Sequence, residues 1–362
     1  MVFYKIYDRL TLALADAALV RDFDVDFDYV ANNTSTIRTT RESKGHKGDL
    51  IALLEGATLV ALGVVTAIDN TDMRISFKHP KELFNDNVLN VFHWTNVGLP
   101  AELNKGFEAV QGLRTILEFG FVNTADPERR LPLEIRTFGA HAGAVWADDA
   151  ACLNVVDFID FLFDHYNIRV DFELDFINDR IVCTIARNTT SGLVLKDNIR
   201  LSKPEMDNNE LPRENRAALF DKNTGRIVQM FYLLQNNDIT TNVNAANRVL
   251  PPATRFIEWD QVEAIREGYT MMDLARSEIG GNIYNHCIKY QLSKTQNMVQ
   301  PNHFRIGDQI TIIYEGRSYD SIFTGLKFKM RDRFITCLFG KTRIDFTDRM
   351  KIHNNRRFAK KE

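Results

Sequence analysis

Cysteine is scarce in this chain of 362 residues, and no two cysteines form a CxxC pair. A zinc ribbon needs two such pairs, and a disulfide framework needs a denser set of cysteines in a small chain. The spacing therefore excludes both, and we expect reduced cysteines that pack in the interior. The four residues are Cys152, Cys183, Cys287 and Cys337.

The chain also lacks an excess of positive charge. It has 45 Lys and Arg against 48 Asp and Glu, which gives a net charge of -3. A protein that binds the DNA backbone generically neutralises several phosphates with basic side chains, so generic nucleic-acid binding is disfavoured. The 44% hydrophobic and 26% charged residues are typical of a globular chain. At roughly 150 residues each, two to three domains are expected.

Long apolar runs are missing as well. No window approaches the roughly 18 consecutive apolar residues of a membrane span, and the start, MVFYKIYDRL, has no apolar signal-peptide core. We therefore expect no membrane-spanning segment and a chain made in a cytoplasm. Possible glycosylation triplets at Asn32, Asn33 and Asn188 carry no weight, because such triplets arise by chance in Asn-rich chains.

The strong sequence signatures of nucleotide, zinc-hydrolase and serine-hydrolase sites are absent, and the eight histidines show no metal-like spacing. We expect no catalytic residue, no cofactor and no metal. The small-residue run around His141 and Trp146 suits a close-packed turn or a loop and indicates no chemistry. A glycan hydrolase stays open, because it needs only two carboxylates at the right separation.

The first hundred residues predict short strands joined by turns, since β-branched and aromatic residues concentrate over 2–9, 23–29 and 35–40. From Gly48 the text continues as a strand, a Glu55-Gly56 turn, a second strand containing Gly63, and a turn at 69–72 before a last strand. This is a meander of the kind found in small barrels.

A similar pattern returns from Gly307 and indicates an internal duplication. Its landmarks, Gly307-Asp308, Glu315-Gly316 and Gly325, match Gly48-Asp49, Glu55-Gly56 and Gly63. The spacing differs by one residue and then by two, which small loops and bulges absorb. Convergent turn chemistry is the alternative, because any β-meander places Gly and Gly-Asp at its turns.

Between the two copies the pattern predicts a helix over 154–166 and a hairpin over 168–186 that turns at Asn178-Asp179. In the helix, Asp157, Asp160 and Asp164 fall on one stripe, which we expect to face solvent. The hairpin alternates apolar with charged residues, as a half-buried strand pair does. Together they predict a small α+β unit.

Strands are also expected over 226–234 and 238–243, and Pro251-Pro252 marks a break. Asp260 and Glu263 form a capping box for a helix that ends at Gly280-Gly281, with Val262, Ile265, Tyr269, Met272 and Ala275 at helical spacing. The fold class is therefore α+β, mainly β and multi-domain, with two small β-barrel domains and an α+β middle domain. The expected ranges are a first barrel at 1–100, the α+β domain at 101–190, a small β-rich domain at 191–255, and a helix plus second barrel at 256–362.

The candidate site residues are four alternating acids, Asp22, Asp24, Asp26 and Asp28. They resemble the start of a calcium loop, but Phe27 stands where such a loop needs Gly and Asn33 stands where it needs a bidentate Glu. Alternation with aromatic and aliphatic residues fits a strand with one acidic face. That face could be solvated, could protect a sheet edge, or could line an anionic lumen past which DNA slides without sticking.

The final stretch, 341–362, has eight basic and three acidic residues, a net charge of +5, whereas the first thirty residues have a net charge of -3. Opposite charge at the two ends would suit barrels from neighbouring copies that meet in a ring. A solvated, disordered tail explains the last eight residues equally well.

Several segments resemble the tail-hub proteins of long-tailed phages and tailocins, the Tal or baseplate-hub family. The segments are KGDLIALLE, ALGVVTAIDN, IGDQITIIYEGRSYDSIFTGLKFKM and ITCLFGKTRIDFTDRM, and the predicted helix and hairpin resemble the middle domain of that family. The likeness spans most of the chain but contains no catalytic signature. Many relatives have C-terminal hydrolase or fibre extensions, whereas this sequence stops shortly after the second barrel.

The resemblance implies a structural virion protein at the tail tip, assembled in the host bacterial cytoplasm. Hub proteins of this family are homotrimers in which two barrels per chain form a pseudo-sixfold ring. The implied partners are a hexameric distal tail protein or tail-tube ring, receptor-binding or fibre proteins, and, transiently, the exiting DNA. The rival functions are a peptidoglycan or glycan hydrolase, and a carbohydrate-binding module that stacks sugar on Trp94, Trp146 or Trp259.

Overall fold

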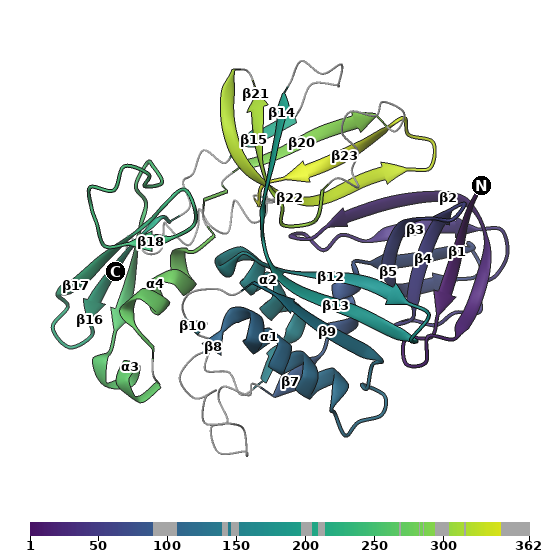
Figure 1. The fold of residues 1–362 in the computed structure, drawn as a ribbon, viewed down its shortest axis with the longest axis horizontal. Coiled ribbons are helices and arrows are strands. Elements are labelled where there is room, and N and C mark those ends of the chain that lie inside the picture. The colour runs from purple at the N-terminus through teal and green to yellow at the C-terminus, as the bar shows by residue number, and fades with distance from the viewer. Residues whose placement is uncertain are drawn as a thin grey trace.

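A computed structural model describes most of the chain (Figure 1). The architecture is mainly β with a few short helices, as the sequence predicted. Within the described residues, no helix is long and apolar enough to cross a membrane. The described ranges are 1–89, 107–139, 144–145, 152–196, 205–208, 214–267, 269–281, 283–284, 286–293, 304–314 and 316–341.

Six N-terminal strands, here called the first repeat, form an antiparallel sheet in the order β1-β4-β5-β6-β3-β2. Because β2 also pairs with β1, the pairings close into a ring. Alternate side chains such as Tyr4, Val25 and Phe77 point inward and are buried. The strands are β1 (Val2–Tyr7), β2 (Leu14–Asp28), β3 (Ser35–Thr39), β4 (Leu50–Glu55), β5 (Thr58–Asp69) and β6 (Arg74–Lys78).

A second set of six strands, the second repeat, has the order β14-β21-β22-β23-β20-β15, which reproduces the order of the first. It differs in that β14 runs parallel to β21, whereas β1 runs antiparallel to β4. Among the described residues β14 and β15 do not pair, so this sheet stays open there. The strands are β14 (Thr190–Lys196), β15 (Glu205–Asn208), β20 (His286–Ser293), β21 (Gln309–Tyr314), β22 (Arg317–Lys329) and β23 (Phe334–Phe339).

The Gly-Asp corner that opens β4 is fixed by a set of short-range hydrogen bonds. Gly48 N donates to Val65 O at 2.8 Å, and Val65 N donates to Asp49 O at 2.8 Å. The Asp49 carboxylate accepts from His46 N at 2.7 Å. Gly48 has φ +95°, a conformation that favours glycine.

The corner that opens β21 repeats this pattern bond for bond. Gly307 N donates to Phe323 O at 2.8 Å, and Phe323 N donates to Asp308 O at 2.9 Å. The Asp308 carboxylate accepts from Arg305 N at 2.7 Å, and Gly307 has φ +87°. The shared strand order and this shared corner support a duplication over convergent turns.

The third landmark of the predicted repeat was wrong. Gly63 pairs with Ile51, three residues after its corner glycine, whereas the residue in the same place of the second repeat is Ser321. Each glycine makes room for the carbonyl oxygen of a different residue. A Cβ at Gly63 would lie 2.4 Å from Lys78 O, and a Cβ at Gly325 would lie 2.0 Å from Phe27 O. Composition alone could not distinguish these two constraints.

The middle unit packs two helices on one face of a three-stranded sheet, β12-β13-β9, in which β13 and β9 are parallel. Asn154 caps the predicted helix, which ends at Asn167 in the left-handed conformation, φ +56°. The elements are η1 (Pro80–Phe84), β7 (Asn87–Leu89), β8 (Phe107–Glu108), α1 (Ala109–Leu117), the π turn η3 (Glu118–Val122), β9 (Leu133–Phe138), β10 (Ala144–Val145), β11 (Cys152–Asn154), α2 (Val155–Tyr166), β12 (Ile168–Asp175) and β13 (Arg180–Arg187).

A fourth group of elements forms the sheet β18-β17-β16-β19 with α4 against one face. A helix begins after Asp260 as predicted, and the Asp260 carboxylate accepts from Val262 N and Glu263 N. The single helix expected up to Gly280 was wrong, because two helices form and the second begins at its own capping box, Thr270 with Asp273. Val262 and Ile265 are 78% and 74% exposed, so the predicted apolar stripe does not continue through the first helix. The elements are β16 (Arg216–Asp221), β17 (Ile227–Leu233), β18 (Ile239–Thr240), β19 (Thr254–Trp259), α3 (Gln261–Glu267) and α4 (Met271–Ile279).

The four predicted domain ranges stay a prediction, and strand pairing joins residues across their edges. Strands β14 and β15 pair with β21 and β20 of the C-terminal third, and β16 pairs with β19. The second repeat is therefore assembled from two stretches of chain, with the fourth group inserted between them.

Candidate interdomain site at helix α2

All four predicted site acids lie on β2, which confirms the strand interpretation. Asp22 is exposed. Asp28 is only 3% exposed, and its carboxylate accepts from Val30 N at 3.1 Å and Ala31 N at 3.2 Å. Asp28 therefore fixes the turn after β2, a role that the alternation did not indicate.

The other two acids meet lysines of the second repeat. Strand β2 pairs antiparallel with the end of β22, so the two repeats share one continuous sheet. Lys327 Nζ lies 2.7 Å from Asp26 Oδ2, and Lys329 Nζ lies 3.2 Å from Asp24 Oδ2. The acidic row is therefore matched by a basic row, which relieves the repulsion between like charges along one strand.

Reversing one charge in this seam should weaken it measurably. We expect Lys327→Glu to lower the free energy of unfolding by about 1 kcal/mol, because the pair is half-exposed. Urea titration would measure the loss, and Asp26→Lys added to Lys327→Glu should restore most of it. Lys222→Glu, at an exposed turn, is the control and should change little. If Lys222→Glu lowered the free energy of unfolding by the same amount, the loss could not be attributed to the ion pair between Lys327 and Asp26.

Helix α2 contacts η1, α1, α4 and β12, and lies near the middle of the molecule (Figure 1). The first repeat continues from β6 into η1, and Lys81 in η1 is 0% exposed and links the two parts. Its ammonium donates to Tyr29 O at 2.7 Å, lies 4.3 Å from the centre of the Tyr29 ring, and pairs with the Asp160 carboxylate. A buried lysine therefore fixes the first repeat to the helix.

The second repeat reaches the same helix through Lys341, which follows β23 and is 1% exposed. Its ammonium donates to Phe163 O at 2.9 Å and Asp164 O at 2.8 Å, and lies 3.5 Å from Asp164 Oδ1. These carbonyls belong to the last turn of α2, where no further helical N–H is available. Each repeat thus fixes α2 with one buried lysine.

The predicted acidic stripe reaches solvent only in part. Asp157 is exposed, whereas the side chains of Asp160 and Asp164 are 31% and 38% exposed and each also pairs with a buried lysine. By sequence, Lys341 is part of the basic C-terminal stretch. The structure shows that Lys341 is buried and that its ammonium contacts the end of α2. Residues 342–362, which carry the rest of that stretch, lie outside the described residues.

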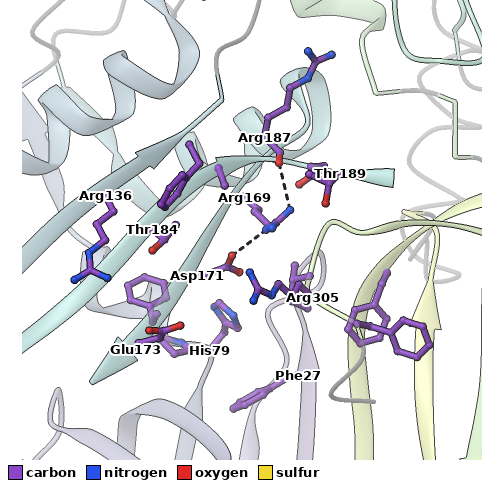
Figure 2. A pocket seen from close by; sticks show the side chains of 18 of the residues that line it. Phe27, His79, Arg136, Arg169, Asp171, Glu173, Thr184, Arg187, Thr189 and Arg305 are labelled. Carbon is purple, nitrogen blue, oxygen red and sulfur yellow. Dashed lines mark hydrogen bonds and ion pairs between the residues drawn. The ribbon is translucent and has the colours of Figure 1, made fainter. Parts of the chain in front are cut away.

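The middle sheet and both repeats surround a cavity of about 850 Å³ (Figure 2). Arg169, only 5% exposed, lies on its wall with Nε 3.0 Å from Asp171 Oδ2 and Nη1 4.0 Å from Asp308 Oδ1. Figure 2 shows Arg305 reaching towards Asp171 from the second repeat. Burial raises the pKa of Asp171, and the two arginines oppose that shift. The second Gly-Asp corner is thus tied to the middle sheet by a charged network.

His79 lies between this cavity and Lys81. Its ring contacts the Tyr29 ring at 5.1 Å and the Phe27 ring at 6.0 Å, and its Nδ1 accepts from Lys81 N at 3.3 Å. Burial lowers the pKa of His79 to about 3, and the charge on Lys81 adds to the shift. The imidazole is therefore neutral in the folded protein at neutral pH.

Because the pKa of His79 is depressed on folding, its contribution to stability is present above about pH 6.5 and is lost as pH falls towards 3. We expect a loss of about 2 kcal/mol between pH 7 and pH 5, measured as the difference between wild type and His79→Gln. Glutamine keeps an acceptor at the cap but cannot be charged. Parallel stability curves for the two proteins would contradict the prediction.

The remaining sequence candidates occupy other environments. Trp259 is 7% exposed and packs against Tyr269, so its face is unavailable to a sugar. Trp94, Trp146 and His141 lie outside the described residues. Cys183, Cys287 and Cys337 are buried free thiols, while the side chain of Cys152 is outside the description. Over the described ranges, no group of three His, Cys, Asp or Glu side chains could hold a metal ion.

No protein-family model matches the chain, and no curated protein sequence matches it. Solved structures do. A tail protein from Neisseria meningitidis MC58 matches with 11% identity over 95% of this chain and 98% of that chain, at a TM-score of 0.52. The prophage tail protein gp18 from Listeria monocytogenes EGD-e matches with 12% identity over 97% of each chain, also at 0.52. The P2 virion baseplate in its activated conformation matches with 13% identity over 94% and 99%, at 0.46.

The first two matches cover nearly the whole of both chains, so the likeness extends over the overall fold and is not limited to one part of the chain. The structural neighbours are phage tail proteins, as the sequence resemblance suggested. The chain therefore has the fold of phage tail proteins.

Proposed function

We propose that this chain is a structural virion protein, a homotrimeric hub that closes the distal end of a tail tube. The observation that carries the proposal is the duplication: two copies of one strand order occur in a single chain, and they are joined where β2 pairs with the end of β22. Three chains with two repeats each present six similar units, which is the simplest route from threefold to sixfold symmetry.

In this proposal the hub sits at the tail tip, beneath a hexameric distal tail protein or tail-tube ring. It anchors receptor-binding or fibre proteins and opens for DNA passage, after assembly in the host bacterial cytoplasm. The whole-chain likeness to tail proteins from two bacterial sources supports the tail location. The charged seam and the two buried lysines support a scaffold that must hold its parts together under load.

The acidic row of β2 remains our candidate for an anionic lumen. Asp24 and Asp26 are matched by lysines, so the exposed Asp22 is the residue that best tests the idea. Asp22→Asn should leave the seam intact and change DNA release from assembled tails. Normal release by this variant, and by the variant with Asn at 22, 24, 26 and 28, would count against a lumen role.

Light scattering behind a sizing column tests the oligomeric state. A trimer should weigh three times 41.6 kDa, about 125 kDa. The measurement should be made on the chain alone and on the chain mixed with the ring protein of its tail. A chain that stays monomeric in both samples would contradict the trimeric hub.

The rival hydrolase has one specific place to act, since Asp171 and Glu173 line the cavity on the same face of β12 (Figure 2). Asp171 is engaged by Arg169, which leaves the acid poorly placed to protonate a sugar. We expect no release of fragments from purified cell walls. Hydrolysis that Glu173→Gln abolishes would establish the rival, and saturable quenching of tryptophan fluorescence by saccharide would favour a binding module.

A further inference from the structure

The contact between Lys81 and Asp160 holds an amine group directly against a carboxyl group in the interior. The two residues are 79 positions apart, and the lysine amine is hydrogen-bonded directly to the Asp160 carboxyl. Lys81 has no exposed surface, and the side chain of Asp160 is 31% exposed. The Tyr29 ring lies 4.3 Å from Lys81 Nζ and packs in turn against the Phe163 ring at 4.6 Å.

Dehydration changes the balance between the charged and neutral forms of this pair. Two ions taken out of water lose solvation that their mutual attraction does not fully replace. Burial raises the pKa of Asp160 to about 6, with smaller contributions from Asp164 and Asp157, while Lys81 opposes the shift. The reactive form arises when one proton moves along the direct hydrogen bond from the ammonium to the carboxylate, which leaves an amine beside a carboxylic acid.

We propose that Lys81 and Asp160 become joined by an intramolecular isopeptide bond. The neutral Nζ attacks the Asp160 carboxyl carbon, the new N–C bond forms, and one C–O bond of the carboxyl group breaks. The departing oxygen takes the transferred proton and one amine proton and leaves as water. No oxidant, reductant or further reactant enters, so the step is a condensation within the chain.

The surroundings suit both the step and its product. A desolvated lysine amine is a competent nucleophile, and a fixed contact supplies a high effective concentration that replaces external activation. The product amide keeps one N–H, and Tyr29 O, already 2.7 Å from Nζ, remains as its acceptor. The partly exposed side of Asp160 gives the water a way out.

The second buried lysine provides an internal comparison. Lys341 also pairs with a carboxylate, but its nitrogen lies 3.5 Å from Asp164 Oδ1 and donates to two main-chain carbonyls at 2.8 and 2.9 Å, so the closest contacts are with the carbonyls. We therefore expect no bond at Lys341 and the loss of a single water from the chain. The inference concerns this chain alone and does not depend on the proposed hub role.

Intact mass spectrometry of the denatured full-length chain is the test. The protein should be lighter than its sequence mass by one water, about 18 Da. A proteolytic digest should contain one branched peptide that joins Lys81 to Asp160. Lys81→Arg and Asp160→Ala should each restore the full mass, whereas Lys341→Arg should keep the loss.

Each other outcome overturns the proposal. A wild-type chain at full mass, purified in the folded state, would show that the contact stays an ion pair. A lighter chain whose branched peptide joins other residues, or whose digest contains only a cyclised residue and no branch, would do the same. Because the decisive measurement is made on the wild type, a variant that fails to fold cannot obscure the result.

Discussion

Replacing Gly281 by alanine is expected to cost about 4 kcal/mol or more of folding free energy, and to separate α4 from α2. Gly281 has φ +78°, and a Cβ built there would lie 1.5 Å from Asp164 O. The amide of the same residue donates to Asn237 Oδ1 at 2.6 Å, so the backbone cannot shift without losing a buried bond. Overpacking against a fixed carbonyl adds to the ordinary strain of alanine at positive φ.

The matched control is Gly225→Ala, in the turn between β16 and β17. Gly225 has φ +65° but nothing within 4 Å of a built Cβ, so only backbone strain of about 1 kcal/mol is expected. Urea titrations of both variants would separate the strain from the close approach. Equal losses would show that the contact between Gly281 and α2 is not a constraint.

Lys341→Met should lower the free energy of unfolding by about 3 kcal/mol. It leaves the carbonyls of Phe163 and Asp164 without their donor at the end of α2 and removes the cation from the negative end of the helix dipole. Hydrogen exchange should also accelerate in the last turn of α2. Methionine keeps most of the apolar stem, so the loss reports the ammonium group.

Lys329→Met is the control for this second prediction, because Lys329 is 56% exposed in the seam between the repeats and pairs with Asp24. Its expected loss is below about 1 kcal/mol. If Lys341→Met loses no more than the control, or if exchange at α2 is unchanged, the buried lysine does not hold the helix end.

Both predictions concern α2 because every part of the molecule fixes it from a different side. The first repeat reaches it through Lys81, the second through Lys341, and the inserted group through Gly281. The hub that we propose would need such a common element, since loads on one part then pass to the others.

Local patterns were sufficient for many of the elements. The alternation along β2, the helix α2 and the Asn178-Asp179 turn each depend on near neighbours in sequence, and each was predicted correctly. The Gly-Asp corners were also visible, because a positive φ and a short-range carboxylate bond leave a local signature at Gly48 and Gly307.

The errors came from partners that are distant in the chain. The acidic stripe of α2 looked solvent-facing because Asp160 and Asp164 carry charge, and nothing local indicates that Lys81 and Lys341 cover them. Gly63 and Gly325 looked equivalent because composition records a glycine but not which carbonyl approaches it.

The sequence by itself determined many of the strands, the central helix, the mainly β class and the existence of two related units, because these follow from periodicity and from turn residues. It did not indicate strands such as β15 and β16, which lie in a polar stretch. Only the tertiary structure decided that β2 and β22 form one sheet across the repeats, that two lysines are buried on α2, and that a charged cavity lies between the units. The physical reason is that ion pairing and close packing depend on contacts between residues far apart in the chain. Local patterns in a single sequence do not show which of those residues come into contact.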